Sequence, residues 1–169
     1  MPIISDGKIS EDSWRLLADD NPAPNMATDR SEPVIVSLER WQRARSEFMG
    51  HNGPLGIRLR SDQAPGPIAG DLGRFDLVAL EFPTMADGRA FSYARLLRER
   101  YGYEGELRAV GKVARDQLYF MQRCGFDAFE ISDDENPDTV LAALSSFSVV
   151  YQPTADDRVP ACKARHTAK

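Results

Sequence analysis

The sequence predicts an α/β protein in which about five strand-then-helix units form a mainly parallel sheet with helices on its faces. Two observations support this class. From residue 34 onward, short apolar runs typical of buried strands alternate with longer stretches whose apolar side chains recur at helical spacing. In addition, the 169 residues, of which 42% are hydrophobic and 28% charged, are enough for one domain with its own core.

The chain is expected to begin with a β-hairpin over residues 1–20, because two short apolar stretches flank Asp6-Gly7, a strong two-residue turn signal. The polar segment that follows contains several prolines and has no periodicity, which indicates a linker over residues 21–32. We expect a single α/β domain over residues 33–153 and a flexible C-terminal tail over residues 154–169.

The first half of the domain contains three expected strands. The apolar run at 34–36 leads into an amphipathic helix at 38–49, which places Leu38, Trp41 and Phe48 on one face. Alternation predicts a strand at 55–59, and a short helix or turn is expected at 68–75. The run Leu-Val-Ala-Leu at 77–80 is typical of a strand buried on both faces.

The second half continues the same alternation. A helix at 90–101 ends at Gly102, and a helix at 113–124 ends at Gly125, because glycine commonly terminates helices. A further helix opens at Pro137, with Asn136 or Asp134 nearby as its cap. The expected strands of this half are 106–110, 128–131 and a last short strand at 149–151.

Two architectures fit this pattern. Each parallel crossover should be right-handed. About five units favour an open, doubly wound sheet of the Rossmann or flavodoxin kind, because a closed barrel needs eight units. The alternative is a partial (β/α) barrel. In both architectures, ligands bind at the carboxyl ends of the strands.

Composition excludes several classes of function. The net charge of −5 argues against a nucleic-acid surface, which needs a basic stripe to replace counterions. No apolar run approaches the roughly 20 residues that cross a bilayer, and the N-terminus lacks the pattern of a secretory signal. We therefore expect a cytoplasmic protein that contacts neither nucleic acid nor a membrane.

The sequence predicts no metal and no evident cofactor. Cys124 and Cys162 form no CxxC pair, and His51 and His166 are far apart, in an expected loop and in the expected tail. Cys124 precedes a helix-ending glycine and is interpreted as a core residue. Neither a dinucleotide fingerprint nor a phosphate-binding P-loop follows any expected strand.

The turn Asp87-Gly88-Arg89 is the first candidate anion site. Gly88 permits close backbone approach, the following helix start offers free N–H groups, and Arg89 offers a bidentate fork for an oxyanion. Ser92 could cap the helix or donate. The competing interpretation is structural: Asp87 caps the helix, and Arg89 holds the loop through an acid such as Glu81.

The stretch GKVARDQ is the second candidate. Gly111 ends a strand, and Arg115 and Asp116 follow early in the next helix, so they could form an anion site or an acid/base pair. The structural interpretation is that Asp116 is an acid favoured by the helix dipole and Arg115 is solvated. If the sheet closes as expected, Glu81, Arg89, Arg115 and Asp116 converge on one edge, with Glu81 or Asp116 as the candidate catalytic base.

Four segments resemble the DUF934 family of uncharacterised bacterial proteins: NGPLGIRL (52–59), LVALEFP (77–83), the long run from Asp87 to Glu130, and FSVVYQP (147–153). The resemblance implies a role in assimilatory sulfate and sulfite reduction, with the sulfite reductase hemoprotein as partner. It implies no established catalytic residues.

Three hypotheses follow. The first is an accessory or regulatory protein that docks on the sulfite reductase hemoprotein or binds a sulfur oxyanion or sulfur metabolite at the strand-end loops. The second is an oxidoreductase that supplies electrons to that reductase, which requires a cofactor because ordinary side chains do not carry electrons. The third is a small α/β lyase or hydrolase that uses a carboxylate base.

Overall fold

The apolar runs form the strands of one eight-stranded sheet in the computed structural model, which describes residues 2–5, 7–20, 32–156 and 158–163. The strands are β1 (Pro2–Ser5), β2 (Lys8–Glu11), β3 (Arg15–Leu16), β4 (Val34–Ser37), β5 (Leu55–Leu59), β6 (Leu77–Phe82), β7 (Glu106–Gly111) and β8 (Ala128–Glu130). Their order across the sheet is β2-β1-β8-β7-β6-β5-β4-β3. The expected linker lies almost wholly at 21–31, outside the described residues.

The sheet is mixed. Strands β3 to β8 run parallel to one another, whereas β1 is antiparallel to both β2 and β8. The N-terminal hairpin is therefore present, and it extends the sheet beyond β8. From β4 to β8 the strands follow one another in chain order, with no reversal. Right-handed crossovers that always step in the same direction place their helices on one face, so the partial barrel forms and the doubly wound arrangement does not.

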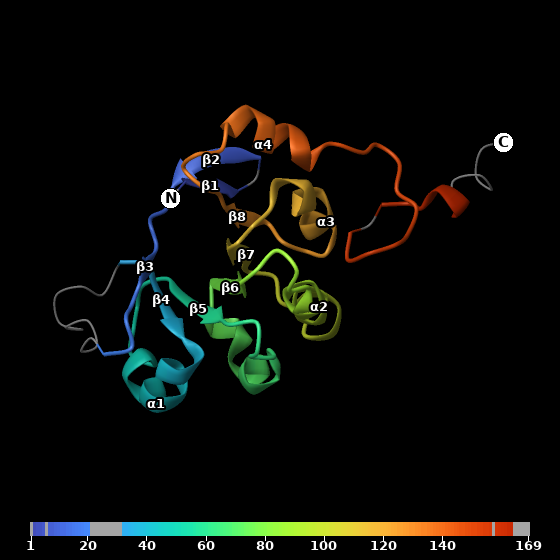
Figure 1. Ribbon diagram of the computed structural model, residues 1–169. Coiled ribbons are helices and arrows are strands. Elements are labelled where there is room, and N and C mark those ends of the chain that lie inside the picture. The colour runs from blue at the N-terminus through green and yellow to red at the C-terminus, as the bar shows by residue number, and fades with distance from the viewer. Residues whose placement is uncertain (1, 6, 21–31, 157, 164–169) are drawn as a thin grey trace.

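The connection between β2 and β3 shows how strongly the sheet curls. These are the two edge strands, and a flat sheet of this width would hold them roughly 34 Å apart. Only three residues separate Glu11 from Arg15, and a fully extended chain of that length spans at most about 14 Å. The sheet therefore bends into a half-barrel. In Figure 1 the strands follow an arc, and the blue N-terminal segment crosses its open side.

The helices cover the outer face of the arc (Figure 1). They are α1 (Leu38–Phe48), the 3₁₀ segment η1 (Gly66–Arg74), α2 (Arg89–Arg95), which continues as a wider turn η2 (Leu96–Arg100), the short turn η3 (Arg115–Gln117), which leads into α3 (Leu118–Arg123), and α4 (Pro137–Leu144). Gly102 and Gly125 follow helices with positive φ, and the Asn136 side chain caps α4, as expected. The expected strand at 149–151 does not form: this segment pairs with neither edge of the sheet, and Val149 and Tyr151 are exposed.

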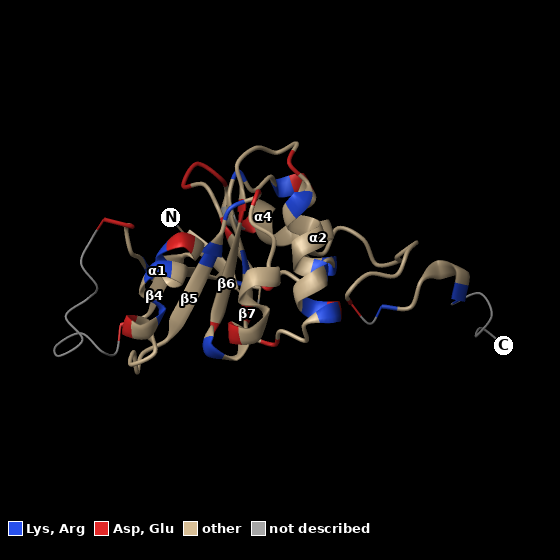
Figure 2. Cartoon of the chain, turned by 90° about the horizontal axis from the view of Figure 1, so that it is seen from below, with Lys and Arg blue, Asp and Glu red and all other residues tan. Residues whose placement is uncertain are grey.

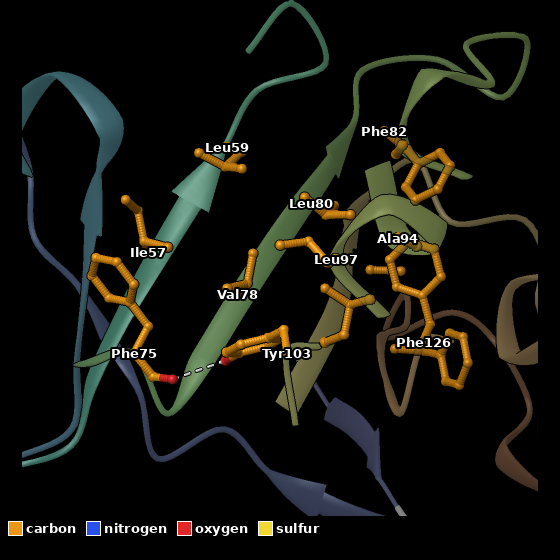
Figure 3. Packing of buried hydrophobic residues seen from close by; sticks show 14 of the residues in the cluster. Ile57, Leu59, Phe75, Val78, Leu80, Phe82, Ala94, Leu97, Tyr103 and Phe126 are labelled. Atoms are coloured by element: carbon orange, nitrogen blue, oxygen red, sulfur yellow. Dashed lines mark hydrogen bonds between the residues drawn. The ribbon is translucent and has the colours of Figure 1, made fainter. Parts of the chain in front are cut away.

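The main core lies between the outer face and the helices. Along β6, Val78, Leu80 and Phe82 point into this core, where they meet Leu97 and Phe126 (Figure 3). The buried hydroxyl of Tyr103 closes one end of the core by donating to the carbonyl of Phe75, 3.0 Å away. Burial raises the pKa of Tyr103 well above its ordinary value, so this donor keeps its proton.

A second, smaller cluster fills the inner face of the half-barrel. Ile35, Leu77, Ala79 and Val110 are buried there, and Trp14, from the connection between the edge strands, packs against them. A Cβ on Gly56 would lie 3.2 Å from the Trp14 ring, so the missing side chain at this position gives the indole its room.

An ion-paired arginine lies beside this cluster. Arg108 of β7 is only 3% exposed, and its guanidinium contacts Asp12 at 2.9 Å and Glu106 at 2.7 Å. Asp12 belongs to the connection that crosses the open side, so the arginine ties that connection to the middle of the sheet. Two carboxylates on one buried guanidinium offset the cost of taking its charge out of water.

The C-terminal segment is attached to α3 by a second buried arginine. Arg123 pairs with Asp156 at 2.9 Å and donates to the carbonyl of Gln152 at 2.5 Å. The first residues of the expected tail therefore contact the domain. Residues 157 and 164–169 lie outside the described part of the chain.

We predict that Arg108→Met lowers the free energy of unfolding by about 3–5 kcal/mol, because it leaves Asp12 and Glu106 as partly buried carboxylates without their cation. Urea unfolding measures this. The matched control is Arg95→Met, which removes an exposed pair with Glu99 and should cost less than about 1 kcal/mol. Equal losses for the two variants would show that Arg108 does not tie the connection to the sheet.

Candidate functional site

A pocket of about 310 Å³ opens at the carboxyl ends of β3 to β6. We call it the strand-end pocket. Its position is the one at which (β/α) folds place ligands, because loops and inward-facing side chains from several strands meet there. It is lined by Leu16, Leu17, Ala18, Asp19, Ser37, Glu39, Arg58, Arg60, Gln63 and Glu81.

One wall of the pocket comes from the N-terminal segment, which folds back over the sheet after β3. The hydroxyl of Ser37, at the end of β4, donates to Asp19 at 2.5 Å. The same hydroxyl oxygen accepts from the backbone N–H of Arg40 at 3.0 Å and so caps α1. Buried Arg40 donates to the carbonyl of Ala18. The wall is therefore fixed to the start of α1 by polar contacts.

The floor of the pocket holds an ion pair between Arg58 of β5 and Glu81 of β6. Arg58 lies opposite Ala79 in the register, so Glu81 is its diagonal neighbour on the inner face. Arg58 Nη2 and Glu81 Oε1 are 3.3 Å apart, and both side chains are about one quarter to one third exposed. Charge-assisted hydrogen bonds are usually about 2.7–2.9 Å long, so this contact is loose.

The rim of the pocket holds a tighter group around Glu39. Arg60 Nη1 lies 2.7 Å from Glu39 Oε1, and Gln63 Nε2 donates to the same oxygen at 2.8 Å. A hydrogen bond from its own backbone N–H, followed by Gln63 and Arg60, lowers the pKa of Glu39 below its ordinary value. Its other oxygen, Oε2, is buried and has no hydrogen-bond partner among the described residues.

A second, more acidic pocket of about 520 Å³ lies farther along the same edge, beyond β6 to β8. It contains Arg115 and Asp116 of the expected GKVARDQ site, together with Asp134 and Glu135. Three carboxylates surround one guanidinium, which makes this pocket unfavourable for a dianion.

Arg89 pairs with an acid of its own turn, as the competing interpretation describes, but the N-cap of α2 is Gly88 and not Asp87. Its guanidinium pairs with Asp87 at 2.7 Å and donates to the hydroxyl of Ser61 at 2.9 Å. Asp87 also accepts from the backbone N–H of Arg89, and these bonds hold the pKa of Asp87 far below its ordinary value. Gly88 precedes the helix at negative φ, and exposed Ser92 lines a shallow hollow with Arg95 and Glu99.

Gly111 also has a structural explanation. It has φ +90°, and a Cβ there would lie 2.7 Å from the carbonyl oxygen of Phe82. Its N–H donates to Glu130 Oε2 at 3.0 Å. The glycine therefore allows β7 to end close against β6.

The four residues expected to converge lie along one edge but occupy three places. Glu81 pairs with Arg58 in the strand-end pocket, Arg89 pairs with Asp87, and Arg115 and Asp116 share the acidic pocket. Reasoning from sequence did not choose Arg58 or Glu39 as candidate site residues, although Arg58 lies near the end of an expected strand and Glu39 follows another. The signal for Arg58 was available: it is the one charged residue of the strand LGIRL, at an inward position.

The remaining candidate groups give no metal site. Within the described residues, no three or more His, Cys, Asp or Glu side chains are placed to hold a metal ion. Cys124 is buried, and burial raises the pKa of its thiol to about 11, whereas Cys162 is exposed. In the described part of the chain, none of the helices has the length and apolar character needed to cross a membrane.

Comparison with known proteins gives one family. The model of a family described as "Bacterial protein of unknown function (DUF934)" matches residues 56–162. The match runs from the second residue of β5 through β8 and α4 to Cys162 in the C-terminal segment. No curated protein matches the chain.

We predict that one thiol reacts quickly with a chromogenic disulfide reagent at pH 8 in the native protein, and two react after unfolding. Cys162 is the fast thiol. Cys124 reacts at least about 100-fold more slowly, because burial limits access and the thiolate is scarce. Burial raises the pKa of the Cys124 thiol from 9.0 to about 11 in the folded protein. Between these two pH values the thiol ionises in the unfolded chain but not in the folded one, so the free energy of unfolding should fall as pH rises from 9.0 to about 11. Cys124→Ala should remove only the slow reaction; two fast thiols in the wild type would contradict the assignment.

Proposed function

Because this chain belongs to the DUF934 family of bacterial proteins, we propose that it is an accessory protein of assimilatory sulfite reduction that docks on the sulfite reductase hemoprotein. The resemblance of about residues 33–153 and of the N-terminal hairpin to that family supports the pathway. An exposed aromatic surface near the C-terminus supports docking, and it is the observation that carries the proposal. Such a partner places the proposed function in the cytoplasm.

The aromatic surface is defined by Tyr119 of α3 with Phe147 and Arg158, which contact one another, together with exposed side chains of the same helix and segment: Phe120, Val149 and Tyr151. Phe147 is 61% exposed and Tyr151 is 81% exposed, which is unusual for large apolar side chains. In Figure 2 the segment that carries them extends away from the sheet and helices. Large apolar side chains left exposed on one segment are typical of protein–protein contact sites.

This surface is partly ordered before any partner binds. The rings of Tyr119 and Phe147 meet edge to face with centroids 5.1 Å apart. The guanidinium of Arg158 lies 5.7 Å from the centre of the Tyr119 ring and donates to the carbonyl of Phe147. Preordered side chains lose less conformational freedom on binding, and Tyr and Arg are enriched among residues that dominate binding energy.

Docking is better supported than oxyanion capture at the strand-end loops. Arg89 is already occupied by Asp87 and Ser61, and Arg115 shares its pocket with three carboxylates. The guanidinium groups expected to bind an oxyanion are therefore neutralised by nearby acids. The aromatic surface has no comparable partner within the described residues.

We predict that the purified protein binds the sulfite reductase hemoprotein of the same bacterium, and that Phe147→Ser with Tyr151→Ser weakens binding at least about tenfold. Loss of two exposed aromatic anchors commonly costs more than about 1.4 kcal/mol. Isothermal titration calorimetry measures the affinity. The control is Met85→Ser, which removes an exposed apolar side chain elsewhere on the molecule and should leave binding unchanged.

Two results would overturn this proposal. The first is absence of binding by the wild-type protein at micromolar concentrations. The second is equal binding by the double variant and the Met85→Ser control, which would place any contact outside the aromatic surface.

A further inference from the structure

We propose that the strand-end pocket binds a free α-amino acid, whose carboxylate lies on Arg58 and whose ammonium group lies on Glu81. This inference concerns a site separate from the aromatic surface and does not depend on the docking partner. It rests on the loose ion pair at the floor of the pocket, the balance of charge around it and the size of the cavity.

The ion pair at the floor has unused hydrogen-bonding capacity. A guanidinium offers five N–H donors and a carboxylate two acceptor oxygens, yet Arg58 and Glu81 share one contact at 3.3 Å. Neither side chain makes a hydrogen bond of good geometry to another described residue. Both are half-buried, so their remaining donors and acceptors face the pocket with restricted access to water. A ligand can therefore bind each partner without breaking a strong contact.

The charges around the pocket favour a ligand that carries both signs. Arg58 and Arg60 are balanced by Glu39 and Glu81, with Asp19 at the wall. A simple anion would approach these carboxylates, and a simple cation would approach the two guanidinium groups, and each such encounter costs free energy. A zwitterion gives each charge an opposite partner.

The geometry favours an α-amino acid among zwitterions. Its ammonium and carboxylate groups are attached to the same carbon atom, so they can engage two protein groups that already lie in contact. Arg58 and Glu81 are such a pair. The buried oxygen Oε2 of Glu39, which has no hydrogen-bond partner among the described residues, is a further acceptor in a residue that lines the pocket.

The rest of the pocket limits the side chain of the ligand. A volume of about 310 Å³ lies at the small end of the range for ligand sites. Leu16, Leu17 and Ala18 form an apolar wall, and Ser37 and Gln63 are the uncharged polar groups. The pocket thus fits a small amino acid with an aliphatic, hydroxyl or thiol side chain.

The test uses the full-length protein and the proteinogenic L-amino acids, with binding measured by thermal shift and isothermal titration calorimetry. We expect at least one small amino acid to bind. The N-acetyl and the amide derivatives of that amino acid should each bind at least about tenfold more weakly, because each lacks one of the two charges. Sulfite and sulfate serve as oxyanion probes and should not compete.

Variants of the floor pair identify the site. Arg58→Gln should lose at least about tenfold in affinity for the amino acid, and so should Glu81→Gln, whereas Arg95→Gln, outside the pocket, should bind as the wild type does. If a glutamine variant fails to fold, Arg58→Lys keeps the charge, and the derivative series on the wild type still tests the proposal.

Three outcomes would overturn it: no amino acid binds, the derivatives bind as well as the parent compound, or the floor variants bind as the control does. Binding of sulfite without binding of any amino acid would replace it with an oxyanion site. If the amino-acid proposal fails, the docking proposal still stands, because the docking test uses different residues and a different binding partner.

Discussion

The structure depends on a constraint of chain length. Three residues join the two edge strands, and this connection is too short to span the distance between them unless the sheet curls into a half-barrel. The curl gives the sheet an inner face, which the same connection then covers with Trp14 and Asp12. It also brings inward-pointing side chains near the carboxyl ends of the strands into one pocket. Fold, inner packing and candidate site thus share a single cause.

Opposite charges are kept together throughout this interior. Arg108 pairs with two carboxylates and is nearly inaccessible to solvent, whereas Arg58 pairs with one and stays about one third exposed. The difference follows from position, because Arg108 lies beneath the connection and Arg58 lies beyond it, at the open end of the strands. A fully paired arginine stabilises the fold, and a partly paired one beside a cavity has donors to spare.

Much of the fold follows from local patterns, and most of the site does not. The run LVALEF and the glycines at 102 and 125 predict a strand and two helix ends because those signals act over a few residues. Strand order depends on which strands pair, and no local pattern contains it, so the open sheet was preferred to the half-barrel. The prediction of the site failed for the same reason. Asp19 and Glu81 are 62 positions apart in the chain, and they line one pocket only after the sheet curls.

The pairing of β1 with β8 has a consequence for how the chain folds during synthesis. Ile3 lies beside Glu130, so β1 needs as its partner a strand that is synthesised much later. At ordinary rates of translation, that wait lasts on the order of ten seconds. Contacts this distant in sequence slow folding, and until they form, the hairpin and the edge of β8 both expose unpaired backbone. Completion of the half-barrel is therefore a late step in folding.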